Sequence, residues 1–348
     1  MIGRQGLLVL CWLVILHACL AKFPNTVSED RFSIEEEPVR IRVEETIFPS
    51  KSKRVAIAVS VTAEEDPKYL ELLGAVSQAV YQLRRTSKFD IDLIAFVLPH
   101  MYKSFKRLRF LGFQVLVRDI PLKLEEVPLG HYRKRLPVSG CCGMAELLKL
   151  HALTLTEYHR VLHIDADVVI LQNIDELFDA PDDVSLLYTN STLEGEVFSG
   201  GVFAVRPCLQ DFESILAVMR TGDYRYSGTG WKGSGVGYGW GGETIQGIMP
   251  YYYLVEKKNS AVLIDRCIYN NQGSEFCAST SILHIKMAHM TLCQKPWHPP
   301  PTKSPLSCKM VHEKWWQLMH SLQDRIGVRR VPRRVPGVAF RLMDLEDE

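Results

Sequence analysis

The sequence predicts an α/β protein whose core is a mostly parallel sheet with helices on both faces. Two apolar, β-branched runs, Val55–Val61 and Ile91–Leu98, have the length and composition of central parallel strands. Between them a helix is predicted from Pro67, because apolar side chains recur at helical spacing at Leu72, Val76, Val80 and Leu83. The succession of strand, helix and strand is typical of a doubly wound α/β sheet.

The length, hydrophobic content and charge of the chain limit what it can be. Its 348 residues are 47% hydrophobic, which is enough for one large or two modest domains with a substantial core. It has 41 Lys and Arg against 40 Asp and Glu, for a formal net charge of +1. Without an overall positive field, the protein is not expected to have nucleic acid as a partner.

Residues 1–21 have the pattern of a secretory leader. Arg4 precedes the apolar stretch Leu7–Leu16, and Cys19-Leu20-Ala21 has the small-x-small pattern of a cleavage site. The stretch is short for a membrane span, so we expect a cleaved signal peptide, with a short signal anchor as the alternative. Both place the protein in the secretory pathway, in the ER or Golgi lumen or secreted, with membrane contact only through an uncleaved leader.

The remainder of the chain is expected to form three parts. Residues 22–53 are charged and punctuated by proline, and we interpret them as a stem or linker. Residues 54–300 are expected to form a single compact domain that ends at Pro299–Pro301. Residues 301–348 are expected to form a helix near Val311–Leu322 and a charged tail.

The cysteines agree with an oxidising compartment but do not define their pairing. Nine are present, and Cys11 and Cys19 lie in the leader, which leaves seven. An odd number implies at least one free or intermolecular thiol, and the adjacent Cys141-Cys142 are not expected to bond each other. Asn190-Ser191-Thr192 is a glycosylation sequon, which the leader makes accessible to the modifying machinery.

Further elements follow from the same patterns. Strands are predicted at Phe113–Val117, Val161–Ile164, Val184–Tyr188, Val202–Val205 and around Ile282–Ile285. Helices are predicted at Met144–Tyr158, at a short turn after Asn173, and from Glu243 to Tyr252. Residues 228–247 hold nine of the 23 glycines, and we expect a mobile loop over a site. Its match to G-x-G-x-x-G is rejected as a dinucleotide site, because no strand precedes it.

Two carboxylates interrupt a buried apolar run at Asp165 and Asp167. If the strand ends at Ile164, both aspartates lie in a turn at the carboxyl edge of the sheet, where open α/β sheets bind ligands. Residues two apart point the same way in β geometry, so both carboxylates can approach one divalent ion. The alternative is a turn with solvated aspartates, since Asp is common in turns.

Five separated motifs then occur together. They are Lys149, Asp165-Ala166-Asp167, Phe198-Ser199-Gly200-Gly201-Val202, Gln246-Gly247, and His289 followed by Lys295-Pro296-Trp297. Together they resemble glycosyltransferase family 8, the glycogenin-like and galactinol-synthase-like group, over about Val55 to Trp297. The resemblance implies a GT-A fold with a Rossmann-like sheet. It also implies transfer of a hexose or related sugar from a UDP-sugar donor, with retention at the anomeric carbon.

The resemblance also implies roles for single residues. Asp165 and Asp167 would bind Mn²⁺ with His289 as the third protein ligand, and two carboxylates with one imidazole suit that ion. Lys295 would contact the diphosphate, where an ammonium stabilises the charge that develops on the departing UDP. Lys149 would contact the sugar or order the first aspartate, and Thr62 would lie on the uridine side.

Gln246 or Glu243 is expected beneath the donor sugar, and the sequence does not decide between them. A carboxamide is a poor covalent nucleophile, so we favour return of the acceptor on the same face, with Gln246 as electrostatic support. The chain departs from the family pattern at Ser199-Gly200-Gly201, at the longer spacing from Glu243 to Gln246, and at Leu292. These departures concern donor choice and the placement of the glutamine more than metal binding.

The acceptor is not named by the sequence and could be a glycan, a protein or a lipid, and a homodimer is left open. One alternative is a catalytically silent GT-A domain that acts as a partner or chaperone in glycan assembly. A nucleotidyltransferase is disfavoured, because residues 55–67 are acidic after the first strand instead of glycine-rich and basic.

Overall fold

The computed structural model describes residues 53–62, 67–191, 198–226, 228–298 and 305–328. The expected leader, nearly all of the stem, the end of the sequon at Thr192, the prolines at 299–301 and the acidic tip of the chain lie outside the described residues. All of the described residues belong to one compact unit, Ser52–Glu348.

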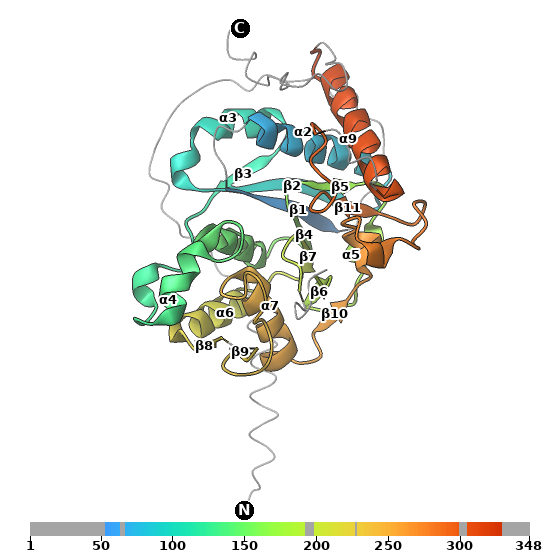
Figure 1. The fold of residues 1–348 in the computed structure, drawn as a ribbon. Helices are drawn as coiled ribbons and strands as arrows, with labels where there is room; N and C mark the ends of the chain where they lie inside the picture. The colour runs from blue at the N-terminus through green and yellow to red at the C-terminus, as the bar shows by residue number, and fades with distance from the viewer. Residues whose placement is uncertain (1–52, 63–66, 192–197, 227, 299–304, 329–348) are drawn as a thin grey trace, which may run out of the picture. The chain divides into compact units, whose positions relative to one another are not determined.

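A mostly parallel sheet forms the centre of this unit (Figure 1). Among the described residues it has seven strands in the order β10-β6-β7-β4-β1-β2-β3. Only β7 runs antiparallel to its neighbours β4 and β6. The strands are β1 Arg54–Val61, β2 Asp90–Val97, β3 Gln114–Val117, β4 Val161–Ile164, β6 Leu186–Tyr188, β7 Val202–Val205 and β10 Ala261–Leu263. The predicted α/β class is therefore confirmed.

Each face of the sheet has its own hydrophobic core, because successive strand residues point to opposite faces. Along β1, Val55, Ile57 and Val59 enter one core, and Ala56 and Ala58 enter the other. Helices α2 Pro67–Leu83, α3 Lys103–Phe110 and α9 Leu306–Arg325 lie above the sheet in Figure 1. The lower layer contains α4 His131–Arg135, α6 Leu209–Thr221 and α7 Ile245–Tyr251.

The C-terminal helix α9 packs directly on α2. A side chain at Gly74 in α2 would place its Cβ 2.9 Å from Leu322 Cδ2 in α9, so glycine permits the close approach. Val311, Trp315, Leu318 and Leu322 enter the upper core. The helix expected near 311–322 is thus longer, at 306–325, and belongs to the same compact unit as the sheet.

Two elements differ from the sequence prediction. The helix expected at Met144–Tyr158 is a 3₁₀ segment, η4, over Gly143–Thr154. Nine of its twelve residues are buried, so it has no solvent face to mark a helical period. The strand expected around Ile282–Ile285 is a turn, and the strand lies later, at β11 Met287–His289. It pairs with β5 Val168–Ile170 in a small antiparallel sheet, a long-range partner that local sequence does not reveal.

The glycine-dense segment is more ordered than the expected loop. Within it β9 Gly230–Trp231 pairs with β8 Tyr224–Arg225, and the Trp231 side chain is fully buried. Its indole nitrogen donates to the Gly242 carbonyl at 2.9 Å, which folds the segment back on itself. The helix expected from Glu243 begins two residues later as α7, and its end continues as η5 Tyr252–Glu256.

Short elements complete the described part of the fold. They are α5 Asp175–Phe178, α8 Arg266–Tyr269, η1 Pro99–Met101, η2 Leu124–Glu126, η3 Leu136–Val138 and η6 Glu275–Cys277.

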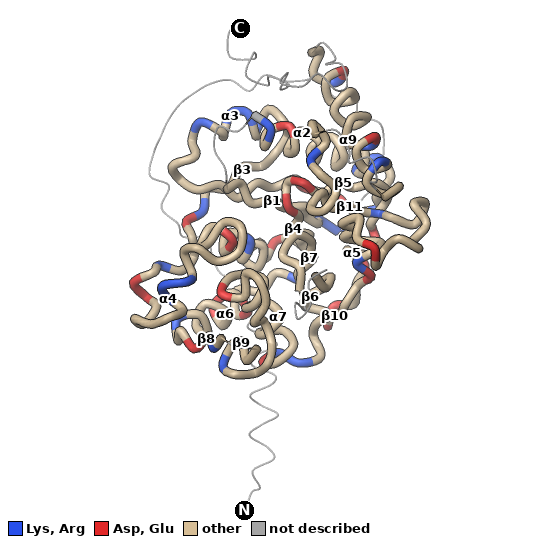
Figure 2. Tube along the Cα trace, in the orientation of Figure 1, with Lys and Arg blue, Asp and Glu red and all other residues tan. Residues whose placement is uncertain are grey.

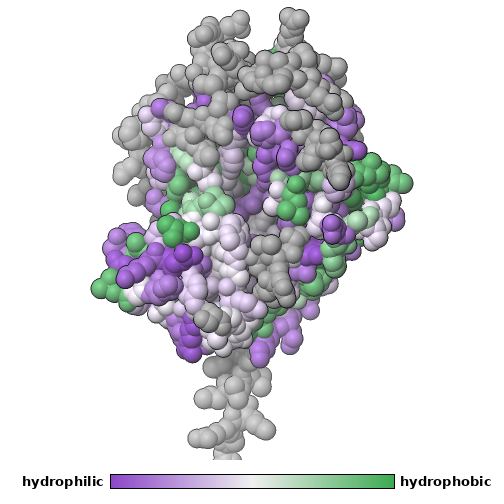
Figure 3. Space-filling model, in the orientation of Figure 1, coloured by the Kyte–Doolittle hydropathy of each residue, from purple (hydrophilic) through white to green (hydrophobic). Residues whose placement is uncertain are grey.

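The surface carries charges of both signs. Figure 2 shows Lys and Arg together with Asp and Glu in both the upper and the lower layer. Figure 3 shows separate hydrophobic patches among hydrophilic surface on the face in view. Within the described ranges, no helix has both the length and the apolar character that a membrane span requires.

Candidate functional site

A cavity of about 500 Å³ opens at the carboxyl ends of β1 and β4. Of the residues to which the sequence analysis gave a role in catalysis, metal binding or donor binding, all but Glu243 line it. The lining includes Thr62, Lys149, Asp165, Ala166, Asp167, Ser199, Gly200, Gly201, Gln246, His289 and Lys295. The fold therefore brings together groups that are up to 233 positions apart in the chain, between Thr62 and Lys295.

The two aspartates leave the sheet in a tight turn. Strand β4 ends at Ile164 as predicted, and the amide of Val168 donates to the Asp165 carbonyl at 3.0 Å to close the turn. The Asp165 amide donates to the carbonyl of Gly201 at 2.9 Å, which fixes the turn to the residue that precedes β7. Both carboxylates consequently lie in the cavity at the carboxyl edge of the sheet.

His289 is positioned by β11, which pairs in register with β5 so that His289 lies opposite Val168. Its Nε2 lies 3.2 Å from Asp167 Oδ1, and its Nδ1 lies 3.0 Å from the side-chain oxygen of Asn270. One ligand atom from each of Asp165, Asp167 and His289 falls within 4.8 Å of the others. The bond to Asn270 favours a proton on Nδ1, so Nε2, which contacts Asp167 here, is the nitrogen that can release its proton and act as a ligand.

Gly201 makes this arrangement possible. A Cβ at that position would lie 2.8 Å from His289 Nδ1 and 3.2 Å from Asp165 Oδ2. From the sequence, small residues here are expected to let a ligand approach the backbone closely. The structure shows that the missing side chain at Gly201 instead leaves room for the ring of His289.

Each of the two carboxylates forms an ion pair with a lysine. Lys295 pairs with Asp167, and its Nζ also donates to the Met290 carbonyl at 2.7 Å. Burial opposes ionisation of Asp167, but His289 and Lys295 outweigh it and hold its pKa well below the usual range. Burial raises the pKa of Asp165, and Lys149 only partly offsets that effect. The cavity therefore holds buried negative charge that a cation would stabilise.

Lys149 connects the first aspartate to the opposite side of the cavity. Its Nζ lies 2.8 Å from Asp165 Oδ1, 2.8 Å from Glu146 Oε2 and 3.2 Å from the carbonyl of Gly200. Burial favours loss of its proton, but Asp165 and Glu146 outweigh this and raise the pKa of Lys149 above its usual value. Of the two roles expected for this lysine, the contact that orders Asp165 is present in the structure.

The structure separates Gln246 from Glu243. Gln246 lines the cavity, where its Oε1 accepts from the Gly200 amide and its Nε2 donates to the Trp240 carbonyl, both at 3.2 Å. Glu243 is buried elsewhere, and its Oε2 accepts from Ser139 Oγ at 2.6 Å. Its other oxygen faces Arg135 and Tyr226. Glu243 therefore supports the fold behind the cavity.

Three residues at the site had been given no role from the sequence. Glu146 lies three positions before Lys149 in η4, a spacing that could have suggested the pair. Asn270 contacts Thr189 Oγ1 at 2.8 Å and Ser199 Oγ at 3.0 Å in addition to His289. Tyr69 lines the cavity from the first turn of α2 and donates to the Ser60 carbonyl at 2.9 Å. No local pattern marks Asn270 or Tyr69.

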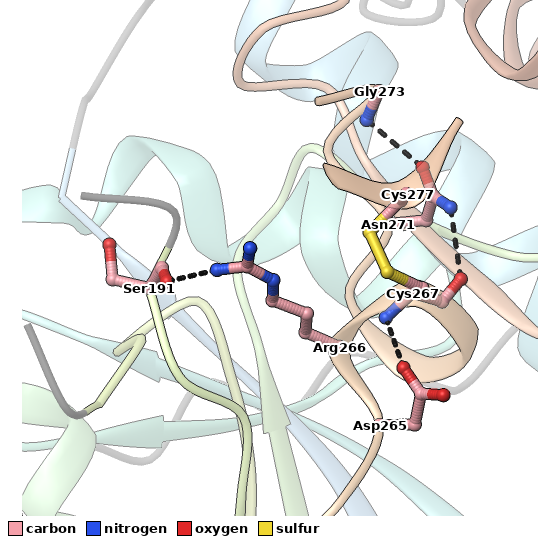
Figure 4. The surroundings of a disulfide bond; sticks show 7 residues. All are labelled: Ser191, Asp265, Arg266, Cys267, Asn271, Gly273 and Cys277. Carbon is pink, nitrogen blue, oxygen red and sulfur yellow. Dashed lines mark hydrogen bonds between the residues drawn. A yellow bond between two sulfur atoms is a disulfide. The ribbon is translucent and has the colours of Figure 1, made fainter. Parts of the chain in front are cut away.

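A disulfide supports the segment that orients His289 (Figure 4). Cys267 and Cys277 are bonded, and Asn271 Nδ2 donates to the Cys267 carbonyl at 2.9 Å. The Asn271 carbonyl in turn accepts from the His289 amide at 2.9 Å. Arg266 reaches from the same helix to the carbonyl of Ser191. The second described disulfide, Cys293–Cys308, ties the segment after His289 to α9.

The residues present fit a divalent metal ion. The donor set is two carboxylates and one imidazole, and the second nitrogen of the imidazole is held by an amide oxygen, as in many metal sites. Oxygen-rich sets of this kind suit Mn²⁺ or Mg²⁺ better than softer ions.

Parts of the chain are similar to known proteins. No family model matches the chain. Glycogenin-2 from Homo sapiens is 26% identical over 155 residues, which cover 44% of this chain and 28% of that protein. UDP-glucuronate:xylan α-glucuronosyltransferase 1 from Arabidopsis thaliana is 38% identical over 68 residues, covering 20% and 10%. Glycogenin from Komagataella phaffii is 25% identical over 252 residues, covering 66% and 57%. The matches thus span less than two thirds of these relatives.

Solved structures with a partly similar backbone include two glycosyltransferases. The bifunctional glycosyltransferase WbbM has a TM-score of 0.49 at 14% identity, covering 80% of this chain and 53% of that one. The glycosyltransferase GlyE from Streptococcus pneumoniae has a TM-score of 0.48 at 12% identity, covering 82% and 65%. Because the curated relatives are glycogenins and xylan glucuronosyltransferases, the predicted resemblance to glycosyltransferase family 8 is confirmed.

Proposed function

We propose that the protein is a retaining glycosyltransferase that moves a hexose or related sugar from a UDP-sugar to an acceptor and requires Mn²⁺. One observation carries the proposal. Asp165, Asp167 and His289 offer three ligand atoms within 4.8 Å of one another in the cavity that Lys295 also lines. A metal beside an ammonium is a suitable binding place for a diphosphate.

Each residue at the site would have a distinct role in binding the metal ion or the donor. Asp165, Asp167 and His289 would hold the ion, which supplies Lewis-acid stabilisation of the leaving diphosphate. Lys295 would donate hydrogen bonds to the diphosphate from its place beside Asp167. Lys149 would keep Asp165 ionised and oriented. Thr62 and Tyr69 would border the nucleoside at the end of β1.

Gln246 is the residue that we assign to the donor sugar. It is a neutral amide in the cavity, held by the Gly200 amide and the Trp240 carbonyl, so its dipole is fixed in direction. No carboxylate other than the metal-binding pair and the lysine-bound Glu146 lines the cavity among the described residues. This favours same-face attack by the acceptor without a covalent glycosyl-enzyme, with Gln246 stabilising the positive charge at the anomeric carbon.

We place the protein in the lumen of the secretory pathway. Two disulfides, Cys267–Cys277 and Cys293–Cys308, support this location, because such bonds persist in oxidising compartments. The secretory leader expected from the sequence points the same way. The acceptor would be a glycan, a protein or a lipid that reaches the cavity mouth.

The test is the release of UDP from each common UDP-sugar, with Mn²⁺ and with candidate acceptors. Asp167→Asn is expected to lower metal-dependent release by more than the 10- to 100-fold typical of losing an outer partner of a metal site. Asp179→Asn is the matched control, because Asp179 is half-exposed and, among the described residues, pairs with Lys88 at the surface. Full activity in Asp167→Asn contradicts the proposed site. Failure of every UDP-sugar to turn over or to raise the melting temperature favours a silent partner domain.

A further inference from the structure

Two adjacent thiols, Cys141 and Cys142, line the same cavity as the aspartates. They are the free cysteines of the described chain, and both are exposed. Of the other described cysteines, Cys267 pairs with Cys277 and Cys293 pairs with Cys308. Cys208 is also disulfide-bonded. The proposed transferase reaction makes no use of these thiols.

The local backbone directs both thiols to one side. Gly140 and Gly143 flank the pair with positive φ values of 63° and 55°. A Cβ at Gly143 would overlap the carbonyl group of Pro137, so only glycine allows the turn to pack there. Adjacent side chains in an extended chain diverge, whereas this turn brings the two sulfur atoms into one cluster.

Glu146 completes the cluster from the first turn of η4. Cys141 Sγ lies 2.7 Å from Glu146 Oε1, and one ligand atom from each of the three side chains lies within 4.8 Å of the others. The Glu146 carboxylate is buried and also lines the cavity. A six-residue segment thus presents two sulfur ligands and one oxygen ligand beside a cavity that leaves room for a further ligand.

We propose that Cys141, Cys142 and Glu146 form a second metal site, selective for thiophilic ions such as Zn²⁺. Thiolate ligands select Zn²⁺ or softer ions, whereas the Asp165, Asp167 and His289 set suits hard ions. The cavity would thus hold a harder site and a softer site, and thiophilic ions would favour the softer one.

Occupation of the soft site would lower transferase activity, a consequence that rests on the proposed function. Glu146 Oε2 lies 2.8 Å from Lys149 Nζ, and Lys149 lies 2.8 Å from Asp165 Oδ1. A cation on Glu146 would repel Lys149 and weaken its hold on Asp165. Zn²⁺ would therefore inhibit from a site that excess Mn²⁺ does not occupy.

The binding experiment uses Cd²⁺ as a spectroscopic probe on the full-length chain after mild reduction, which keeps Cys141 and Cys142 as thiols and leaves the disulfides intact. Cadmium bound to thiolate gives an ultraviolet charge-transfer band, which cadmium bound to carboxylate and imidazole does not. Wild type and Asp167→Asn are expected to show the band with saturation at a single Cd²⁺ and its loss when Zn²⁺ is added. The Cys141→Ser/Cys142→Ser variant should lack it, and Glu146→Gln should bind about tenfold more weakly. The double variant keeps Cys11 and Cys19, so it also controls for thiols outside the described residues.

Each outcome decides between the two proposals. No thiolate band in reduced wild type, or the same band in the double variant, overturns the soft site whatever the enzyme activity. A normal band with no turnover of any UDP-sugar leaves the soft site supported while the transferase proposal fails. With turnover established, equal inhibition by Zn²⁺ of wild type and the double variant, each relative to its own rate with Mn²⁺ and without Zn²⁺, would refute the inhibitory link.

Discussion

The two walls of the cavity differ in chemistry and in what holds them. The carboxylate wall consists of Asp165, Asp167, His289 and Lys295, and it is charged. The amide wall consists of Ser199, Gly200 and Gln246 with the backbone of Trp240, and it is neutral. One wall therefore suits a metal ion and a diphosphate, and the other suits a sugar ring with hydroxyl groups.

The support of the two walls also differs. The carboxylate wall is held by strand pairing, since β4 ends at the aspartates and β5 pairs with β11 at His289. The amide wall is held by side-chain hydrogen bonds. Gln246 bonds to the Gly200 amide and the Trp240 carbonyl, and Asn270 and Lys149 donate to Ser199 Oγ and the Gly200 carbonyl. We infer that the carboxylate wall is the more rigid and that small changes in the amide wall alter donor choice with less effect on metal binding.

The largest expected effect comes from Gly201→Ala, which disturbs the carboxylate wall by a steric clash and leaves its charged groups unchanged. Its Cβ would lie 2.8 Å from His289 Nδ1, so the ring must move away from Asn270 and the aspartates. Losing this orientation is expected to weaken Mn²⁺ binding by about 10- to 100-fold. The electron paramagnetic resonance signal of free Mn²⁺ measures the affinity without reference to activity.

Gly200→Ala is the matched control for that change. Its Cβ would meet Ile245 Cγ2 at 3.0 Å and Gln246 Cγ at 3.3 Å, so it disturbs the amide wall instead. We expect unchanged Mn²⁺ affinity and a raised KM for the donor. Equal loss of Mn²⁺ affinity in both variants would show that the two walls are not independent.

Gln246→Ala is expected to have the next largest effect. It removes the hydrogen bonds to the Gly200 amide and the Trp240 carbonyl, each worth about 1 kcal/mol. It also removes the amide that we assign to the donor sugar. We expect kcat to fall about tenfold or more, with unchanged Mn²⁺ affinity. The control is Gln210→Ala, because Gln210 is exposed on α6 and its side-chain amide donates to Ser214 Oγ in the same helix. Unaltered kcat with every donor would remove Gln246 from the proposed reaction.

The carboxylate wall was largely predictable from the sequence. An apolar run cut by Asp165 and Asp167 identifies a strand end, because ionised groups are costly within a buried strand. The strand before His289 was misplaced because Ile282, Leu283 and Ile285 look like a strand, yet Leu283 is 77% exposed. The true strand is three residues long and is defined by its pairing with β5.

The amide wall was less predictable, because its contacts come from distant parts of the chain. Glu243 and Gln246 lie three positions apart, and the sequence gives no reason to prefer either. The difference arises from Ser139, Arg135 and Tyr226, which bind Glu243 behind the cavity. Glu146 was overlooked for a related reason, since η4 is buried on most sides and has no periodic pattern from which to read which side chains face the cavity.

The smallest expected effect concerns η4, which carries Lys149 between the two walls. His151 in this segment is buried between the rings of Phe96 and Phe212, and its Nε2 lies 2.9 Å from the Asp119 carbonyl. Burial lowers the pKa of His151, so the unfolded chain takes up a proton more readily than the folded protein. The stability that this difference provides is complete above the unfolded pKa of about 6.5 and is lost as the pH falls toward the lower folded pKa.

The free energy of unfolding of the wild type, measured in urea without metal, should therefore fall below about pH 6.5. His151 alone should contribute at most about 1.4 kcal/mol per pH unit to this fall. His151→Gln keeps a donor toward the Asp119 carbonyl and should flatten that part of the profile, whereas His100→Gln, at an exposed position, should not. If both variants follow the wild-type profile, His151 does not set the acid stability of η4. The pH dependence of activity would then have to be sought in the two walls themselves.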